Sequence, residues 1–220
     1  EMKMMFTKRT AFIAMLLLAF CFSLLYAGDG KKLKKQSEKL VKKVERAATG
    51  TAEAYSNIYS ALGKVKEATE LEKITKELKV KDDVDTDKLE KMMETVLKYG
   101  TELEKIDLAK EEISEEGKEK LGMSIICMTV ATNLYNEATD EAKKLLPKAE
   151  KALKGLSGFS AMKEAGPIKE AIGNCKWVGV KSPPQMKQLA TAMKKITDYA
   201  TANGIPLPSK EDIAKKAKEL

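Results

Sequence analysis

Apolar residues recur at every third or fourth position through most of the chain that follows Gly30. Three such stretches can be followed, over residues 33–78, 89–106 and 121–156. Residues at this spacing share one face of an α-helix, because the helix turns once every 3.6 residues. The pattern therefore predicts long amphipathic helices that pack side by side.

Residues of particular local chemistry mark the ends of these stretches. Asp85 or Thr86 is expected to cap the second helix, because a short polar side chain there can accept a hydrogen bond from a free backbone N–H. Ser114, with two glutamates directly after it, favours the start of the third helix. Pro147 lies inside the third stretch and lacks an N–H, so we expect it to kink or divide that helix.

The pattern weakens between residues 157 and 182, where glycines interrupt short apolar runs. Glycine lowers helix stability, so this stretch predicts a connector with short helices. The motif Ser182-Pro183-Pro184-Gln185 then favours a new helix, because serine can cap it and proline suits its first turn. Asn203-Gly204 is expected to end that helix in a left-handed cap. Ser209, with Asp212 three residues later, predicts a last short helix.

An uncharged apolar segment occupies residues 10–27, between two basic residues and a polar turn. A basic start, an apolar stretch and a small last residue, here Ala27, are typical of a secretory signal peptide. A lipoprotein signal with lipid on Cys21 is one alternative, but the bulky Phe20 occupies a position that needs a small residue. A retained membrane anchor is the other alternative, because about 18 apolar residues can just cross a bilayer. The lysines that follow the segment favour this second alternative, since positive flanks tend to stay cytoplasmic.

Together these elements predict an all-α protein, an elongated antiparallel bundle of three to five helices preceded by an N-terminal hydrophobic helix. Residues 1–27 are expected to form the signal peptide or anchor, and residues 28–156 the long-helix bundle. Residues 157–182 are expected to form the Gly-rich connector, and residues 183–220 a C-terminal helix pair that packs on the bundle. We expect the protein to be exported to the periplasm or cell surface, with anchoring by residues 10–27 as the alternative.

The composition agrees with a helical protein and adds a basic charge. The net charge is +7, and lysine carries nearly all of it, because Arg9 and Arg46 are the only arginines. Aromatic residues make up only 5% of the chain. Arginine forks and aromatic stacking are the usual means of binding nucleic acid, so a nucleic-acid partner is not expected.

The chain contains no histidine, which removes several kinds of catalytic and metal site. A Ser-His-Asp triad, histidine-ligated zinc or haem iron, and an imidazole base are not available to it. The sequence also lacks a Gly-rich phosphate-binding loop. Its carboxylates lie beside lysines at the spacings of solvated helix surfaces. We therefore expect a non-enzymatic protein with no catalytic residue, metal or cofactor.

Two cysteines, Cys127 and Cys175, follow the N-terminal segment. In an exported protein this even number permits a disulfide. It would close a loop of about 48 residues and stabilise the fold by roughly 3 to 4 kcal/mol on the chain-entropy account. The alternative is that Cys127, which lies within an apolar run, is simply a small buried residue.

Two stretches are candidates for contact with a membrane. The uncharged residues 123–134 predict a buried central helix, or alternatively a patch that contacts lipid; they are too few to span a bilayer alone. The second stretch predicts contact with an anionic surface or acidic partner, the alternative being a solvated helix start. Its seven lysines are Lys31, Lys32, Lys34, Lys35, Lys39, Lys42 and Lys43.

The function that these features favour is that of a non-enzymatic structural or protein-interaction protein of the bacterial cell envelope. Long apolar stripes of heptad-like spacing can pair between chains, so the expected partner is another protein or a second copy. The alternatives are a membrane-active bundle that binds lipid or forms pores, and a helical carrier that holds a small ligand between its helices.

Overall fold

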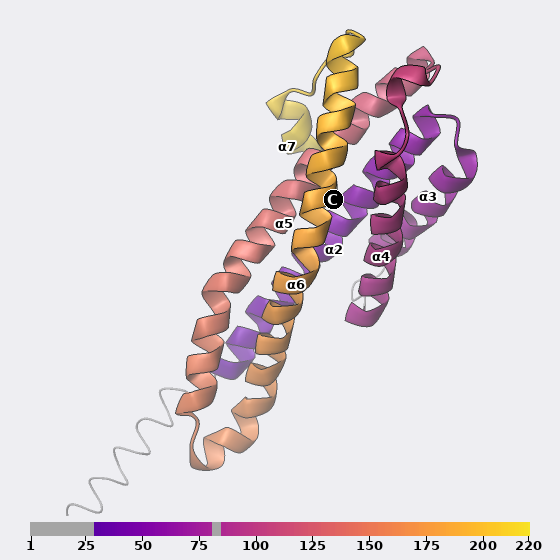
Figure 1. Ribbon diagram of the computed structural model, residues 1–220. Coiled ribbons are helices and arrows are strands. Elements are labelled where there is room, and N and C mark those ends of the chain that lie inside the picture. Colours follow the sequence, from indigo (N-terminus) through magenta and orange to yellow (C-terminus); the bar gives the residue numbers. More distant parts are fainter. Residues whose placement is uncertain (1–28, 81–84) are drawn as a thin grey trace, which may run out of the picture. The chain divides into compact units, whose positions relative to one another are not determined.

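The computed structural model describes residues 29–80 and 85–220, which are helical almost throughout (Figure 1). The elements are α2 (Asp29–Ala61), α3 (Val65–Val80), α4 (Thr86–Glu104), the short 3-10 helix η1 (Leu108–Lys110), α5 (Glu115–Gly155), α6 (Gly158–Ala202) and α7 (Lys210–Glu219). No strand occurs among the described residues. The all-α prediction is therefore confirmed for them, whereas the apolar segment at residues 10–27 lies outside the described part of the chain.

Local sequence chemistry sets several helix ends. The Asp85 carboxylate caps α4 by accepting a hydrogen bond from the N–H two residues later, at 3.2 Å. The Ser114 hydroxyl accepts one from the N–H three residues later, at 3.1 Å, where α5 begins. Gly204 follows the end of α6 with φ +65°. Ser209 and Asp212 form a capping box at α7. The predictions for these four helix ends are confirmed.

The described helices divide into two compact units, and α2, α5 and α6 each contribute a segment to both. Unit 1 contains the described residues 29–39 and 142–176. Unit 2 contains residues 40–141 and 177–220, of which residues 81–84 are not described. Each unit is considered by itself below.

In unit 1 the start of α2 runs alongside the first part of α6, in the same direction. The N–H of Gly30 donates to the Glu164 carboxylate at 3.0 Å, and the Asn174 amide donates to the Ser37 hydroxyl at 3.1 Å. These contacts surround a small apolar core. Its buried side chains are Leu33, Ala142, Leu145, Ala149, Ala152, Ile168, Ala171 and Cys175.

In unit 2 α2 and α5 run in opposite directions. Lys43 of α2 contacts Glu137 and Glu141 of α5 at 3.1 and 2.6 Å. Toward the other end of α2, Ser60 accepts a hydrogen bond from Lys120, in the first turns of α5, at 2.9 Å. These contacts show the two helix segments to be antiparallel neighbours.

α4 and α6, which are not consecutive in the chain, run in the same direction in unit 2. Gln185 of α6 donates to the carbonyl of Met93 at 2.9 Å, and Gln188 donates to the Thr101 hydroxyl at 2.8 Å. Both glutamines are buried. Because a buried amide without a partner is costly, these bonds favour one alignment of α6 along α4.

Residues 123–134 lie in α5 and face mainly into unit 2. Cys127, Met128 and Ala131 are fully buried there, whereas Met123 is 45% exposed. This burial favours the interpretation of the stretch as a central core helix. Among the described helices, none is both long enough and apolar enough to cross a membrane.

The prediction of a Gly-rich connector with short helices at residues 157–182 is wrong. These residues belong to α6, which continues without interruption from Gly158 to Ala202. Ser182 is therefore a buried residue inside α6 and not the cap of a new helix. The carbonyls that Pro183 and Pro184 leave without donors belong to the exposed residues four positions earlier, where water can bind them.

The prediction of one long helix over residues 33–78 was also wrong. The apolar stretch over residues 33–78 is not one helix, because the chain turns between α2 and α3 at Gly63, which has φ +68°. Glycine adopts this left-handed conformation at little cost, so the chain can turn here. The three- and four-residue spacing of apolar residues continues in the helix on each side of the turn and therefore does not reveal it. Of the two outcomes expected at Pro147, division of the helix does not occur, because α5 continues from Glu115 to Gly155; a kink stays a prediction. Pro147 lies on the exposed side of the helix, where water can reach the carbonyl four residues earlier.

Candidate functional site

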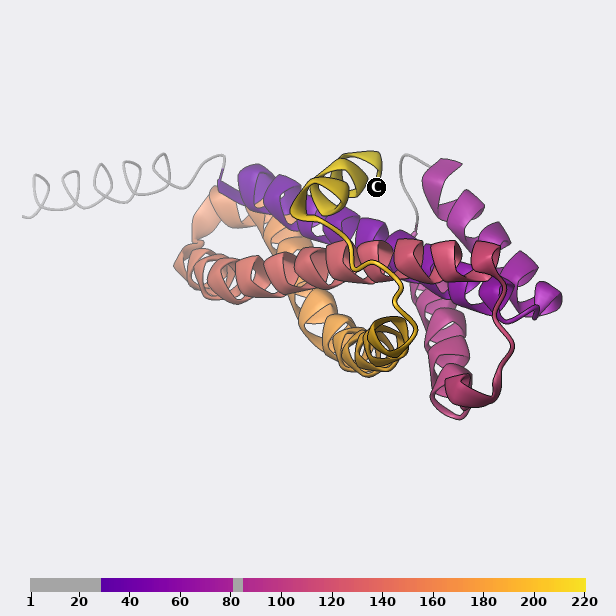
Figure 2. The same cartoon turned by 90° about the horizontal axis from the view of Figure 1, so that it is seen from above.

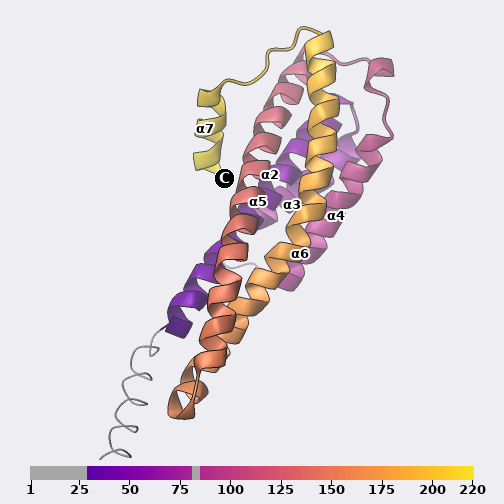
Figure 3. The ribbon, with the colours of Figure 1, turned by 60° about the vertical axis from the view of Figure 1, so that its left-hand side comes forward.

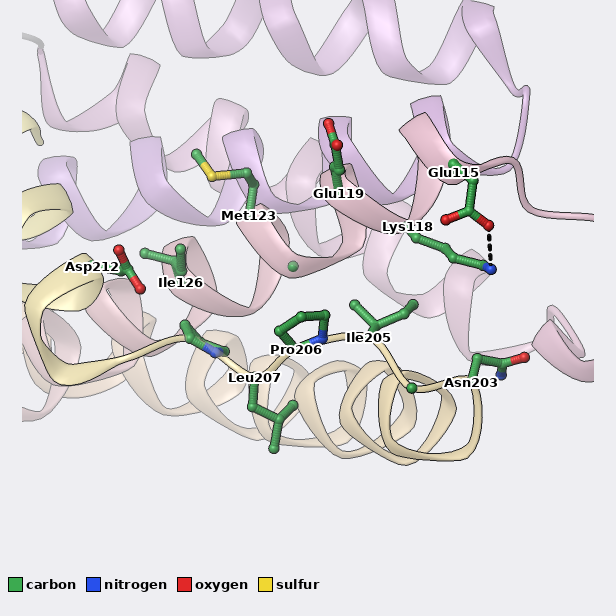
Figure 4. Close-up of a pocket in the computed structure, with 13 residues that line it drawn as sticks. Glu115, Lys118, Glu119, Met123, Ile126, Asn203, Ile205, Pro206, Leu207 and Asp212 are labelled. Atoms are coloured by element: carbon green, nitrogen blue, oxygen red, sulfur yellow. Dashed lines mark hydrogen bonds and ion pairs between the residues drawn. The ribbon is translucent and has the colours of Figure 1, made fainter.

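An open groove of about 660 Å³ lies in unit 2, between the first turns of α5 and the linker that joins α6 to α7 (Figure 4). One wall is a single face of α5, with residues at three- and four-residue spacing. The other wall is the linker itself, residues 203–208, with Asp212 at the start of α7. The α5 side chains that line the groove are Glu115, Lys118, Glu119, Met123 and Ile126.

The linker sequence explains why this wall is extended. Gly204 ends α6, and Pro206 and Pro208 lack the N–H groups that a further helical turn would need. Ile205 is 7% exposed and anchors the linker, whereas Leu207 is 53% exposed. Figure 3 shows the linker leaving the end of α6 and passing α5 on its way to α7.

The groove has an apolar interior with charged residues at its rim. Ile205 and Pro206 point from the linker toward α5, whereas the exposed side chains of Met123 and Leu207 extend outward from the space between them (Figure 4). Glu115 is paired with Lys118 at 2.6 Å.

Asp212, at the end of the groove, is held by the start of α7. It accepts hydrogen bonds from the hydroxyl of Ser209 at 2.6 Å and from the backbone N–H of Ser209 at 3.0 Å. These bonds keep the pKa of Asp212 below its ordinary value. The groove therefore offers an apolar contact surface more readily than reactive chemistry.

Sequence reasoning did not find this groove, because its walls come from segments about 80 residues apart. Two signals in the sequence point to it. The uncharged stretch 123–134 begins with Met123, which has no place in the core, and the Pro206-Leu207-Pro208 motif exposes a leucine. Exposed apolar side chains that gather in one place are typical of interaction surfaces.

The seven lysines proposed for an anionic contact do not form one set. Lys34 pairs with Glu170 at 2.8 Å, and the hydrogen bond from this pair raises the pKa of Lys34. Lys43 is held by two glutamates of α5, and Lys42 also has a partner. The other four, which are exposed and lie in unit 1, are Lys31, Lys32, Lys35 and Lys39. An anionic contact through them stays a prediction.

The two cysteines are buried and free in the structure, Cys127 in unit 2 and Cys175 in unit 1. Burial raises the pKa of Cys127 to about 12 and that of Cys175 to about 11. Both thiols are therefore protonated at neutral pH and are weak nucleophiles and metal ligands. The disulfide between them stays a prediction.

Within residues 29–80 and 85–220, no three acidic, cysteine or histidine side chains are grouped as metal ligands would be. Comparison of the chain with protein-family models, with curated proteins and with solved structures gives no significant match.

Proposed function

We propose that the chain is a non-enzymatic protein-interaction protein of the bacterial cell envelope, folded as an elongated antiparallel helical bundle. The observation that carries the proposal is the open groove between α5 and the α6–α7 linker. Five large apolar side chains are more than 40% exposed among the described residues, and two of them, Met123 and Leu207, lie at this groove.

The groove suits an apolar segment of another protein better than a small molecule. Binding sites for small molecules usually enclose 70–90% of the ligand surface, whereas this groove is open along one side (Figure 4). An apolar side chain of the partner would fill the space between α5 and Pro206. Glu119, at the rim, would attract a basic residue beside it.

Gly122 provides a way to block the groove without disturbing the core. It lies on the groove wall, and a Cβ atom added there would meet no atom within 4 Å. We therefore expect G122W to fold normally and to fill the groove. G179W is the matched control, because Gly179 of α6 is exposed, lies outside the groove and is equally free of neighbours.

Photo-crosslinking in the native host tests the proposal. A photoreactive phenylalanine derivative at position 207 is expected to give a discrete protein adduct on illumination. The adduct should disappear in G122W and persist in G179W. The proposal is contradicted if position 207 gives no adduct, or if blocking the groove leaves the adduct unchanged.

A further inference from the structure

The fold separates charge between the two units. Unit 1 has 13 lysines and five acidic residues within residues 29–39 and 142–176, a net charge of +8. Unit 2 has 24 basic and 27 acidic residues, a net charge of −3. The chain's positive charge is thus concentrated in a small unit made from segments more than 100 residues apart.

The acidic residues of unit 1 are largely occupied within the unit. Glu170 pairs with Lys34 at 2.8 Å, and Glu150 with Lys176 at 3.9 Å. Glu164 accepts the hydrogen bond from the backbone of Gly30. Nine exposed lysines of unit 1 form no ion pair with any described residue: Lys31, Lys32, Lys35, Lys39, Lys144, Lys148, Lys151, Lys154 and Lys169.

Some of these lysines lie at the same end of unit 1 as an exposed apolar side chain, among them Lys31, Lys32 and Lys154. The bond between Gly30 and Glu164 places the first turn of α2 beside the first turns of α6. The last turn of α5, with Lys154, leads directly into α6. Met162 in the first turns of α6 is 83% exposed, the largest exposed fraction among the large apolar residues of the described chain.

We propose that unit 1 binds the surface of an anionic phospholipid bilayer, with its unpaired lysines on the headgroups and Met162 at the acyl boundary. Clustered lysines next to an apolar segment are suited to anionic lipid, and the apolar residues 10–27 directly precede α2. Nucleic acid is the weaker partner for this surface. The described residues of unit 1, 29–39 and 142–176, contain no arginine, and Phe159 is the only aromatic residue among them.

Flotation of the full chain with vesicles measures the charge-dependent part of this binding. The quantity is the ratio of its partition coefficients into vesicles with about 30% phosphatidylglycerol and into pure phosphatidylcholine. Binding through the apolar segment does not need anionic lipid, so its contribution is common to both kinds of vesicle and cancels in the ratio. We expect a ratio well above one that falls as salt is raised from about 0.05 to about 0.3 M.

Neutralising four exposed lysines of unit 1 should lower this ratio. Each lysine at an anionic surface contributes about fivefold to binding, so K32Q/K35Q/K148Q/K151Q is expected to lower the ratio by at least about tenfold. Circular dichroism should show unchanged helix content, because all four side chains are exposed.

The matched control removes the same charge from unit 2. The variant K66Q/K73Q/K98Q/K187Q replaces four exposed lysines that form no ion pair with described residues. It is expected to change the ratio less than about threefold, through net charge alone. An equal loss in both variants, or a wild-type ratio of one, overturns the proposal. RNA binding by the same proteins is measured in parallel. The proposal is also overturned if the unit 1 variant loses RNA binding while its lipid ratio is unchanged.

A tryptophan probe tests whether position 162 of unit 1 meets the lipid. M162W should show a blue-shifted emission and quenching by brominated lipid when anionic vesicles are added. V65W is the control, because Val65 of unit 2 is 71% exposed and is expected to stay in water. Equal shifts in both variants contradict the proposed orientation. The groove lies in unit 2, so a failure of lipid binding would not contradict the proposed protein contact. A failure of the protein contact likewise would not contradict lipid binding by unit 1.

Discussion

Glu53 of α2 holds lysines from two other helices of unit 2. Its carboxylate accepts hydrogen bonds from Lys79 of α3 at 3.1 Å and from Lys216 of α7, whose side chain is only 8% exposed. Figure 2 shows α7 lying against α2. Burial by itself raises the pKa of Glu53, but the hydrogen bonds from Lys216 and Lys79 outweigh it and keep the pKa below its ordinary value.

Glu53→Gln is expected to lower the free energy of unfolding at neutral pH by about 1 to 3 kcal/mol. The reason is that Lys216 would keep its charge with little access to water. Because the folded-state pKa of Glu53 is lowered, the wild-type stabilisation is complete above its ordinary pKa of about 4.3. This stabilisation is lost as pH falls through the lowered folded-state pKa of Glu53. The difference in free energy of unfolding between the wild type and the variant should therefore shrink at that pH. Urea unfolding over this pH range measures it.

Glu72→Gln provides the control for this prediction. Glu72 and Lys76 are 4.0 Å apart and more than half exposed, so the change should alter stability by less than about 0.5 kcal/mol. A similar loss in both variants would show that the buried position of Lys216 has no special effect.

At the scale of one element, α6 shows how tertiary packing overrides helix propensity. It contains Gly166, Gly173 and Gly179, each of which lowers helix stability by about 0.5 to 1 kcal/mol relative to alanine. Burial of an isoleucine or valine side chain contributes about 1.5 to 3 kcal/mol. The apolar face of α6 therefore more than offsets its glycines. Its buried residues include Ile168, Ala171, Cys175, Val178 and Leu189.

Gly173→Ala is expected to raise the free energy of unfolding by about 0.5 to 1 kcal/mol. A Cβ atom at this position meets nothing within 4 Å, and the residue is already helical. Thermal unfolding followed by circular dichroism measures the change. A loss of stability would mean that α6 needs the flexibility of glycine here.

Gly100→Ala in α4 is the contrasting variant. Its Cβ would lie 2.3 Å from the Gln188 side chain and 2.7 Å from the Tyr55 hydroxyl. We expect a loss of about 1 to 3 kcal/mol from this overpacking, despite the better helix propensity of alanine.

At the scale of the whole molecule, the chain combines an N-terminal apolar segment, a basic unit and an acidic unit. The order along the sequence does not reveal the last two, because α2, α5 and α6 each pass through both. The two proposed contacts are accordingly separate. Protein binding is assigned to the groove of unit 2, and lipid binding to the lysines of unit 1.

The intact mass of the protein from its native host tests the predicted targeting segment. We expect a chain that begins at Gly28, because Ala27 is a suitable last residue of a signal peptide. A mass that retains residues 10–27 supports the anchor instead, and a lipid-sized increment at Cys21 supports a lipoprotein. Alkylation before and after reduction reports on the bond between Cys127 and Cys175 in the same sample.

Much of the local structure could be predicted from the sequence. The helical class follows from periodic apolar residues, and the ends at Asp85, Ser114, Gly204 and Ser209 follow from bonds or conformations that involve only a few adjacent residues. The candidate groove could not be predicted, because the linker lies beside α5 only after both helices have packed.

The amino-acid sequence was sufficient to predict the helical class, the helix ends at Asp85, Ser114, Gly204 and Ser209, and the lack of histidine side chains. Helix propensity and capping act within one or two turns, and composition does not depend on the fold. The turn at Gly63, the continuation of α6 through its glycines and the set of lysines brought together in unit 1 depend on the packed fold. These features could not be predicted because burial and ion pairing act between segments distant in sequence. Their summed free energy can outweigh the preference of any single residue.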